Sequence, residues 1–363
     1  MKLAIIGAST GQLPLCLKAK EMGIETICFA WEQGAICKDF VDKFYPISVL
    51  EKDGILQICK LEEVNGIVSN ASDLLAEITA YLAEKLSLNG NSYKNLLNIR
   101  NKKYVREVSN TIENLNSVRI YQLNETIEYP CIVKPIQGAA KKGVSFVLEK
   151  LGLEDAIKYT SECEDNILIE QYIEGQEISV EVISYKKKHY ILQITDKDNT
   201  GAPHFVELGH HQPSQINDDI KSKIQCVVLE LLDKLGYENG ASHIEFKIDK
   251  SENLYLIEVN PRGGGDEISA RLVQLSTGYD YIKGIIEVAL GCFSQPYITQ
   301  YECSGIYYLC EQSKNLFKNI PDNQVPWLVE KNIQTLNLTE ATGNYDRNGY
   351  LIYKWNSPRP LNN

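Results

Sequence analysis

Positive charge is scarce in this sequence. Lys and Arg number 37 against 48 Asp and Glu, which leaves a formal net charge of -11 over 363 residues. Affinity for nucleic acids comes mainly from clustered cations that displace counterions from the phosphate backbone. We therefore expect no nucleic-acid partner, although short basic runs at 101–103 and 141–142 leave room for a single nucleotide.

Long apolar runs and paired cysteines are missing as well. No stretch approaches the ~18 apolar residues of a membrane-spanning helix. The apolar run at 3–6 is too short for a signal peptide and predicts a buried strand. The ten cysteines stand singly, without Cys-x-x-Cys spacing, so a zinc cluster and a disulfide framework both lack support. We expect reduced, mostly buried thiols in a cytoplasmic protein without a membrane partner.

Two common nucleotide-binding signatures are also incomplete or absent. The turn at 7–12 has Ser9 and Gln12 where a dinucleotide-binding fingerprint has its second and third glycines. An NAD-dependent oxidoreductase is therefore supported by the first glycine of that turn alone. The Gly-x-x-x-x-Gly-Lys-Ser/Thr pattern of P-loop proteins does not occur, so that class is unsupported.

What the chain does contain is a change of pattern along its length. From 3 to about 88, short apolar segments alternate with helical stretches, which predicts a doubly wound α/β unit. Between 129 and 195, strand-like segments follow one another at hairpin spacing among helices, which predicts an α+β arrangement. Two more strand-like segments stand among turn residues after 291. We expect three domains, at residues 1–95, 96–290 and 291–363.

Two adjacent strand-like segments carry acidic side chains on one face. In 241–248, strict alternation places Glu245 opposite to the apolar residues, and in 254–260 Glu258 and Asn260 share one face. If these strands pair through the short turn between them, the three side chains converge as hard oxygen ligands of the kind that Mg²⁺ prefers. The alternative is a solvated sheet face, where Glu and Lys are common.

Segments rich in small residues follow two strands. At 261–266, three glycines permit close backbone approach and Arg262 offers charge-assisted hydrogen bonds to phosphate or carboxylate. Upstream, Lys134 ends an apolar strand and precedes the small-residue loop at 137–144, whose backbone N–H groups could fold over phosphates. The stretch 167–177 supplies a strand, a turn and acidic residues. Such a connector suits the adenine and ribose of a nucleotide.

In this order, the motifs resemble the ATP-grasp superfamily over about residues 1–290. The resemblance rests on Lys103, Lys134-Pro135 with its loop, residues 170–177, Glu245 and residues 258–262. Residues 205–214 and 264–280 are similar to the carboxylate-amine ligase and L-amino acid ligase group. The resemblance implies an N-terminal α/β domain, a two-lobed ATP-grasp fold with its ATP lobe at about 120–185, and a small β-rich C-terminal lobe.

The resemblance also implies roles for individual residues. Lys103 and Lys134 would contact phosphates, together with Gly138 and Lys141 of a loop that lacks the serines of many relatives. The adenine pocket would be lined by Glu170, Gln171, Tyr172 and Ile173, and Glu177 would bind ribose. Two Mg²⁺ ions, which Mn²⁺ could replace, would be held by Glu245, Glu258 and Asn260. Catalysis would involve Arg262, Lys134 and Lys141, and substrate binding would involve His210, His211 and Arg271.

Some of these roles have plain alternatives. For Arg271, the alternative to substrate binding is a structural ion pair. For His210 and His211, the alternative to a substrate contact is a capped turn. A metal site at His210 and His211 is not supported, because the sequence has no carboxylate or Cys at metal-ligand spacing from them.

The implied reaction is ATP-dependent amide formation. A carboxylate attacks the γ-phosphorus of ATP to give an acyl phosphate and ADP, and an amine then displaces phosphate. Phosphoryl transfer needs mainly alignment and charge stabilisation, so no side-chain nucleophile is required. We expect small carboxylate and amine substrates of the amino-acid type, and a homodimer is compatible with the resemblance. The alternatives are a purine-pathway ATP-grasp enzyme acting on a ribonucleotide and an inactive nucleotide-binding protein.

Overall fold

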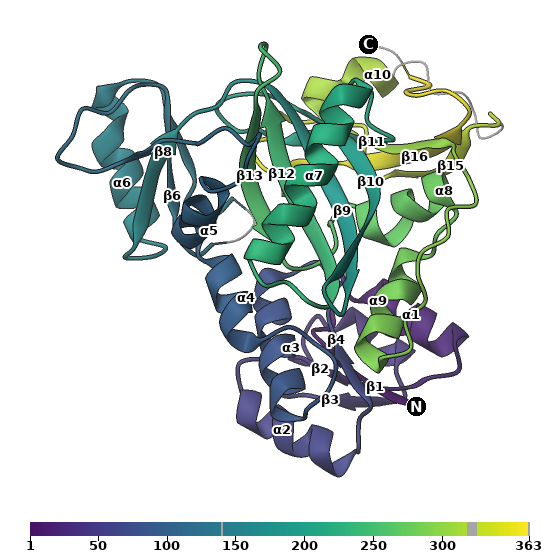
Figure 1. The fold of residues 1–363 in the computed structure, drawn as a ribbon. Coiled ribbons are helices and arrows are strands. Elements are labelled where there is room, and N and C mark those ends of the chain that lie inside the picture. Colours follow the sequence, from purple (N-terminus) through teal and green to yellow (C-terminus); the bar gives the residue numbers. More distant parts are fainter. Residues whose placement is uncertain (139–140, 318–324, 362–363) are drawn as a thin grey trace.

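The computed structural model describes residues 1–138, 141–317 and 325–361 (Figure 1). The first part is a parallel sheet with strand order β3-β2-β1-β4. Its strands are β1 (Lys2–Ile6), β2 (Glu25–Phe29), β3 (Lys43–Tyr45) and β4 (Gly66–Val68), and its helices are α1 (Leu13–Glu21), α2 (Lys52–Leu61) and α3 (Asp73–Lys85). Strands β1, β2 and β4 are largely buried because helices cover both faces, and the edge strand β3 is more exposed.

Each face of this sheet has its own apolar core. Residues of α1 pack on one face together with α9 (Tyr281–Leu290), which comes from much later in the chain. Residues of α2 and α3 pack on the other face. The doubly wound α/β unit predicted from the alternating pattern is therefore confirmed, with one covering helix supplied from outside it.

A small antiparallel lobe follows the linking helices α4 (Tyr93–Arg100) and α5 (Lys102–Ser109). Its strand order is β5-β8-β6-β7. The strands are β5 (Ile120–Tyr121), β6 (Cys131–Pro135), β7 (Ser145–Val147) and β8 (Ile167–Gln171). Helix α6 (Leu153–Ser161) packs on this sheet around a small core that includes Cys131, Val133 and Ala156. Figure 1 shows this lobe beside the large sheet and above the N-terminal sheet.

The large sheet is antiparallel throughout, in the order β13-β12-β9-β10-β11-β14-β16-β15. Its strands are β9 (Gln176–Tyr185), β10 (Lys188–Asn199), β11 (Glu207–Gln212), β12 (Gly240–Ile248), β13 (Leu254–Asn260), β14 (Cys303–Tyr308), β15 (Leu328–Ile333) and β16 (Gly349–Trp355). Helix α7 (Asp218–Lys234) buries the apolar face of β9, β12 and β13. The opposite face packs against α9 at one end, through Ile183 and Ala241, and carries polar side chains such as Glu181 and Glu245 further along.

Shorter elements complete the described chain. They are the helices α8 (Val273–Thr277) and α10 (Lys314–Phe317), a π-helical turn at Ile268–Leu272, and 3₁₀ turns at Ile36–Phe40, Lys150–Gly152, Glu311–Ser313 and Asn344–Asp346. Strands β14, β15 and β16, from the segment expected to be a β-rich lobe, continue the large sheet. The boundaries at 95 and 290 stay predictions.

The cysteines agree with the expectation of free thiols. All ten are free, and only Cys163, Cys226 and Cys292 are exposed. None of the helices in the described part of the chain combines the length and apolar character needed to cross a bilayer. The cytoplasmic location and the homodimer stay predictions.

Candidate active site

The two acidic strands pair in the register that brings their carboxylates together. Glu245 on β12 lies directly opposite Glu258 on β13. Residues directly opposite in an antiparallel pair have neighbouring Cβ atoms on one face of the sheet. Asn260 lies one row further along, opposite His243, and its Nδ2 donates to the His243 carbonyl over 3.3 Å. The three predicted ligands therefore share the polar face of the sheet.

Each carboxylate keeps one oxygen available. The Oε1 atom of Glu245 accepts hydrogen bonds from Lys197 Nζ at 2.9 Å and His243 Nε2 at 3.0 Å. The Oε1 atom of Glu258 lies 3.0 Å from Lys102 Nζ. Within residues 1–138, 141–317 and 325–361, nothing donates a hydrogen bond to Oε2 of either side chain. Carboxylate and amide oxygens are the donor set that suits Mg²⁺, so these residues fit the metal.

A cavity of about 180 Å³ lies between the small lobe and the large sheet, next to this pair. Ten of the predicted site residues line it: Lys134, Gly138, Lys141, Glu170, Gln171, Tyr172, Ile173, Glu177, Glu245 and Glu258. Apolar side chains such as Ile132, Val144 and Ile257 also line it. One end is therefore suited to a flat apolar ring and the other to charged groups. We call it the nucleotide cavity for its shape and lining.

Lys103 does not reach this cavity, and Lys102 does. Asn101 caps helix α5, with Oδ1 accepting from the Tyr104 backbone N–H at 3.1 Å. Successive side chains on an α-helix point about 100° apart. That phase turns Lys102 toward Glu258 and leaves Lys103 exposed to solvent. Of the two lysines, Lys102 is therefore the one that lines the cavity, and the phosphate contact stays a prediction.

A buried ion cluster holds Lys134 in place. Glu170 pairs with Lys134 and with Arg106, whose Nε lies 3.0 Å from Glu170 Oε2. Burial alone raises the pKa of Glu170, but the two cations outweigh it and lower that pKa to about 2. Burial also lowers the pKa of Lys134. Glu170 is therefore a carboxylate that faces cations, and its predicted contact with adenine is indirect at most.

Arg106 was missed by sequence reasoning. Its side chain is 2% exposed and its Nη2 donates to the Ile257 carbonyl over 3.0 Å, so it links α5, β8 and β13. An arginine in a short polar helix gives no local signal of such a role, because its partners are distant in sequence.

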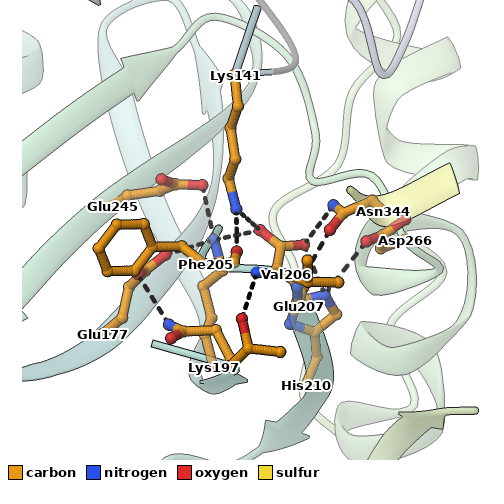
Figure 2. Close-up of polar contacts among 12 residues, drawn as sticks. Lys141, Glu177, Lys197, Phe205, Val206, Glu207, His210, Glu245, Asp266 and Asn344 are labelled. Carbon is orange, nitrogen blue, oxygen red and sulfur yellow. Dashed lines mark hydrogen bonds and ion pairs between the residues drawn. The ribbon is translucent and has the colours of Figure 1, made fainter. Parts of the chain in front are cut away.

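A second cavity, of about 610 Å³, adjoins the first at the carboxylate pair. Glu245 and Glu258 line both cavities. Figure 2 shows Lys197 of β10 among three carboxylates near this point. Its Nζ lies 2.9 Å from Glu245, 3.0 Å from Glu177 and 3.2 Å from Glu207. Burial lowers an ammonium pKa, but these carboxylates raise the pKa of Lys197 well above its usual range.

The second cavity contains an acidic group around one of the predicted histidines. His210 Nε2 lies 3.4 Å from Glu207 Oε2 and 3.6 Å from Asp266 Oδ2, as Figure 2 shows. Arg347 forms a bidentate ion pair with Asp266, in which Nη1 lies 2.8 Å from Oδ2 and Nη2 lies 2.9 Å from Oδ1. Neither ring nitrogen of His210 makes a hydrogen bond to any described residue. The imidazole is therefore buried at the cavity wall, and both of its ring nitrogens are available for a ligand.

These three groups lie close enough together to hold a cation, with ligand atoms within 4.8 Å of one another. Their charge is already offset, however, because Lys197 and Lys141 approach Glu207 at 3.2 and 3.6 Å and Arg347 covers Asp266. Burial lowers the pKa of His210, but the two carboxylates raise it above its usual value.

The other two predicted substrate residues lie elsewhere. His211 points to the opposite face of β11 from His210, because neighbouring residues in a strand alternate. Its Nδ1 is 3.0 Å from the Tyr353 hydroxyl and its Nε2 is 3.1 Å from Asp198. Arg271 pairs with Glu330 of β15 at 2.6 Å. Neither lines the nucleotide cavity or the second cavity, so the geometry favours the structural alternative for Arg271.

Arg262 lines the second cavity and links it to the N-terminal domain. Its Nε lies 3.2 Å from Asp73 at the start of α3. The following Gly-rich turn is also anchored, since Gly263 N donates to Asn70 over 3.0 Å. The turn at 7–12 is closed by its own side chain: Gln12 Oε1 accepts from Ser9 N–H at 3.0 Å.

Comparison with known proteins agrees with this geometry. Residues 127–271 match the ATP-grasp domain family. The chain is 28% identical to D-alanine–D-alanine ligase of Thermosipho africanus over 47% of its own length and 48% of the relative. It is 26% identical to alanine–anticapsin ligase of Bacillus amyloliquefaciens over 66% of its own length and 57% of the relative. It thus spans about half of the length of the curated relatives it matches.

Solved structures give the same fold. The crystal structure of an L-amino acid ligase from Bacillus licheniformis superimposes with a TM-score of 0.80 at 23% identity, covering 98% of this chain and 94% of that chain. Phosphoribosylglycinamide synthetase from Anaerococcus prevotii gives 0.77 at 21% identity, covering 98% and 94%. At these identities the likeness shows the fold. Residues 127–271 therefore belong to the ATP-grasp domain family, and the whole chain has the fold of these ligase structures.

Proposed function

We propose that this chain is an ATP-dependent carboxylate-amine ligase, which forms an amide or peptide bond through an acyl phosphate and releases ADP and phosphate. The observation that carries the proposal is the position of Glu245 and Glu258. They face each other across two strands and line both the nucleotide cavity and the second cavity. A phosphoryl group passing from one cavity to the other would pass these carboxylates.

The nucleotide cavity would hold ATP. Tyr172 and Ile173 would border adenine, where Lys247 Nζ donates to the Ile173 carbonyl over 3.0 Å and lies 4.7 Å from the Tyr172 ring centre. Glu177 would accept from the ribose hydroxyls. Lys102 and Lys134, with Lys141 and the backbone at Gly138, would neutralise the phosphates. Lys102 already bonds the Gly138 carbonyl at 3.2 Å, so it ties this loop to the site.

The carboxylate pair would hold Mg²⁺, as two ions that Mn²⁺ can replace. When bound, the metal neutralises charge on the transferring phosphoryl group and orients it. The free Oε2 atoms of Glu245 and Glu258 are the ligands on the facing strands. Asn260 Oδ1 is a further oxygen on the same face, because its amide nitrogen is the atom that bonds the His243 carbonyl.

Three cations border the path between the cavities. Lys197 lies among Glu177, Glu207 and Glu245, which face the nucleotide, the substrate and the metal in this proposal. Its ammonium would stay close to the γ-phosphoryl group during transfer and offset its charge. Arg262 and Lys141 both line the second cavity and would stabilise the same charge.

The second cavity suits substrates that carry both charges. Its lining combines the acidic side chains Glu207 and Asp266 with the cations that pair with them, Lys141, Lys197 and Arg347. An amino acid presents an ammonium and a carboxylate, so each of its charges would find an opposite charge in this lining. His210, buried between Glu207 and Asp266, would contact the substrate ammonium region.

Trapping with hydroxylamine tests this function. The full chain is incubated with ATP, Mg²⁺, hydroxylamine and a panel of amino acids and other small carboxylates. An acyl phosphate is captured as a hydroxamate, so we expect a hydroxamate with at least one amino acid and one ADP for each hydroxamate formed. ADP release stimulated only by aminoimidazole ribonucleotide would instead support the purine-pathway alternative. Tight ATP binding without turnover on any acid would support an inactive nucleotide-binding protein.

Lys102 and Lys103 form a matched pair for testing the nucleotide cavity. We expect Lys102→Ala to raise the KM for ATP by about tenfold, because a charge-assisted contact of about 1.5 kcal/mol is lost. Lys103→Ala should leave that KM unchanged, because its side chain is exposed and lines neither cavity. Steady-state ADP production over a range of ATP concentrations measures both. A larger effect at Lys103 would reverse the assignment.

A further inference from the structure

A buried chain of hydrogen bonds runs from the Gly-rich turn to Glu245. The backbone N–H of Gly264 donates to Glu181 Oε2 over 3.0 Å. The other oxygen of Glu181 contacts His243 Nδ1. The second ring nitrogen of His243, Nε2, lies 3.0 Å from Glu245 Oε1. The Glu181 side chain is fully buried.

We propose that His243, held by Glu181, is a positioning residue that orients the Glu245 carboxylate for the metal and ties this orientation to the Gly-rich turn. The inference rests on the proposed function, because it takes Glu245 to be a metal ligand. Neither Glu181 nor His243 touches the nucleotide or the metal in this account, although His243 also lines the second cavity. Both act on the metal through Glu245.

Strand register builds this arrangement. Glu181 of β9 lies directly opposite His243 of β12, and Glu245 is one row further along the same face of β12. The imidazole therefore spans two rows of the sheet, with one nitrogen on each carboxylate. A ring that donates from both nitrogens to fixed acceptors cannot turn without breaking a buried hydrogen bond, which costs about 1–3 kcal/mol.

The contact leaves one oxygen of Glu245 free for the metal. His243 Nε2 and Lys197 Nζ both approach Oε1, at 3.0 and 2.9 Å. The last torsion of a glutamate side chain is broad and only weakly restrained by itself. Two donors on one oxygen fix that torsion and turn Oε2 away from them. Partners that orient metal ligands in this way typically contribute 10–100-fold to metal affinity or activity, so roughly that effect is expected of His243.

The same contact couples the metal ligand to the substrate wall. A Cβ atom on Gly264 would lie 2.8 Å from Glu181 Oε1 and 2.8 Å from His243 Nδ1. The turn can therefore approach the pair only because residue 264 is glycine. The neighbouring Gly265 lines the second cavity. A shift of the turn on substrate binding would be transmitted through Glu181 to the carboxylate at the metal.

The test is the affinity of the full-length chain for Mn²⁺ in the presence of ADP, measured by electron paramagnetic resonance. We expect His243→Gln to weaken Mn²⁺ binding by roughly 10–100-fold, because the metal ligand Glu245 loses the hydrogen bond that orients it. ADP binding without metal should be unchanged. The Mg²⁺ concentration for half-maximal ATP turnover should rise by a similar factor. The matched control is His189→Gln, whose histidine bonds Ser184 and Asp233 outside the site and should keep wild-type Mn²⁺ affinity.

The outcomes separate three accounts. A merely structural role would lower the melting temperature of His243→Gln and leave the Mn²⁺ affinity of the folded chain unchanged, and this result would overturn the inference. Failure of the wild-type chain to bind Mn²⁺ with ADP would instead overturn the proposed function itself. Should His243→Gln not fold by circular dichroism, His243→Asn provides the same test, because the asparagine amide takes the place of Nδ1 beside Glu181 and leaves nothing in the place of Nε2 beside Glu245. Wild-type Mn²⁺ affinity in a folded His243→Asn would equally refute the inference.

Discussion

The Glu258→Gln variant is expected to lose ATP turnover and keep its fold. Its side chain is 31% exposed and packs on no apolar core, so the substitution removes a charge without leaving a buried void. The substitution removes the charged metal ligand that β13 places opposite Glu245. We expect ADP production to fall by at least about 10²-fold, which corresponds to about 2.7 kcal/mol of lost transition-state stabilisation.

The control for this variant is Glu174→Gln. Glu174 is 77% exposed, pairs with Lys250 at 3.6 Å and lines neither the nucleotide cavity nor the second cavity. It should have wild-type turnover, and both variants should have wild-type melting temperatures. Near-normal ADP release by Glu258→Gln under saturating Mg²⁺ would refute the role of Glu258.

The Lys197→Met variant is expected to lose both stability and turnover. Its ammonium is 2% exposed and neutralises Glu177, Glu207 and Glu245. Methionine fills similar space but leaves carboxylates facing one another without their shared cation. Removing one partner of a buried ion pair typically costs about 3–5 kcal/mol, and we expect a loss of that size in the free energy of unfolding. Denaturant titration of the full chain measures it.

The response to Mg²⁺ distinguishes loss of the Lys197 charge from a general loss of stability. If Lys197 supplies the charge that a bound cation also supplies, Mg²⁺ with ADP should raise the melting temperature of Lys197→Met more than that of the wild type. Lys187→Met is the matched surface control, since Lys187 is 68% exposed and pairs with Glu238 at 3.2 Å. It should lose less than about 1 kcal/mol. Equal stability of the two variants would contradict the assigned role of Lys197.

Strand alternation made the carboxylate pair predictable. A strict period of two fixes which residues share a face, and the short turn between β12 and β13 fixes the pairing, so Glu245 and Glu258 followed from local sequence. Helix α5 was harder. Its apolar residues set its phase, but which of its two adjacent lysines faces the nucleotide cavity depends on Glu258 and Gly138, which are distant in sequence. The sequence predicted Lys103 for the phosphate contact, whereas Lys102 is the lysine that lines this cavity.

Residues that act through distant partners gave no local signal. Lys197 depends on carboxylates from β9, β11 and β12, and Arg106 depends on β8 and β13. His210 and His211 were predicted together, although a strand turns adjacent side chains to opposite faces and only His210 lines the second cavity. The sheet order that joins β14, β15 and β16 to the large sheet likewise depends on pairings between segments far apart in the chain.

The location of Mn²⁺ in crystals of the full-length chain grown with ADP tests the central claim most directly. Anomalous scattering identifies the ion without assumption about its ligands. The account predicts a peak bonded to Oε2 of both Glu245 and Glu258 and to a phosphate oxygen of ADP. A peak at Glu207, His210 and Asp266 alone, or ADP bound with no ion between the two strands, would contradict it.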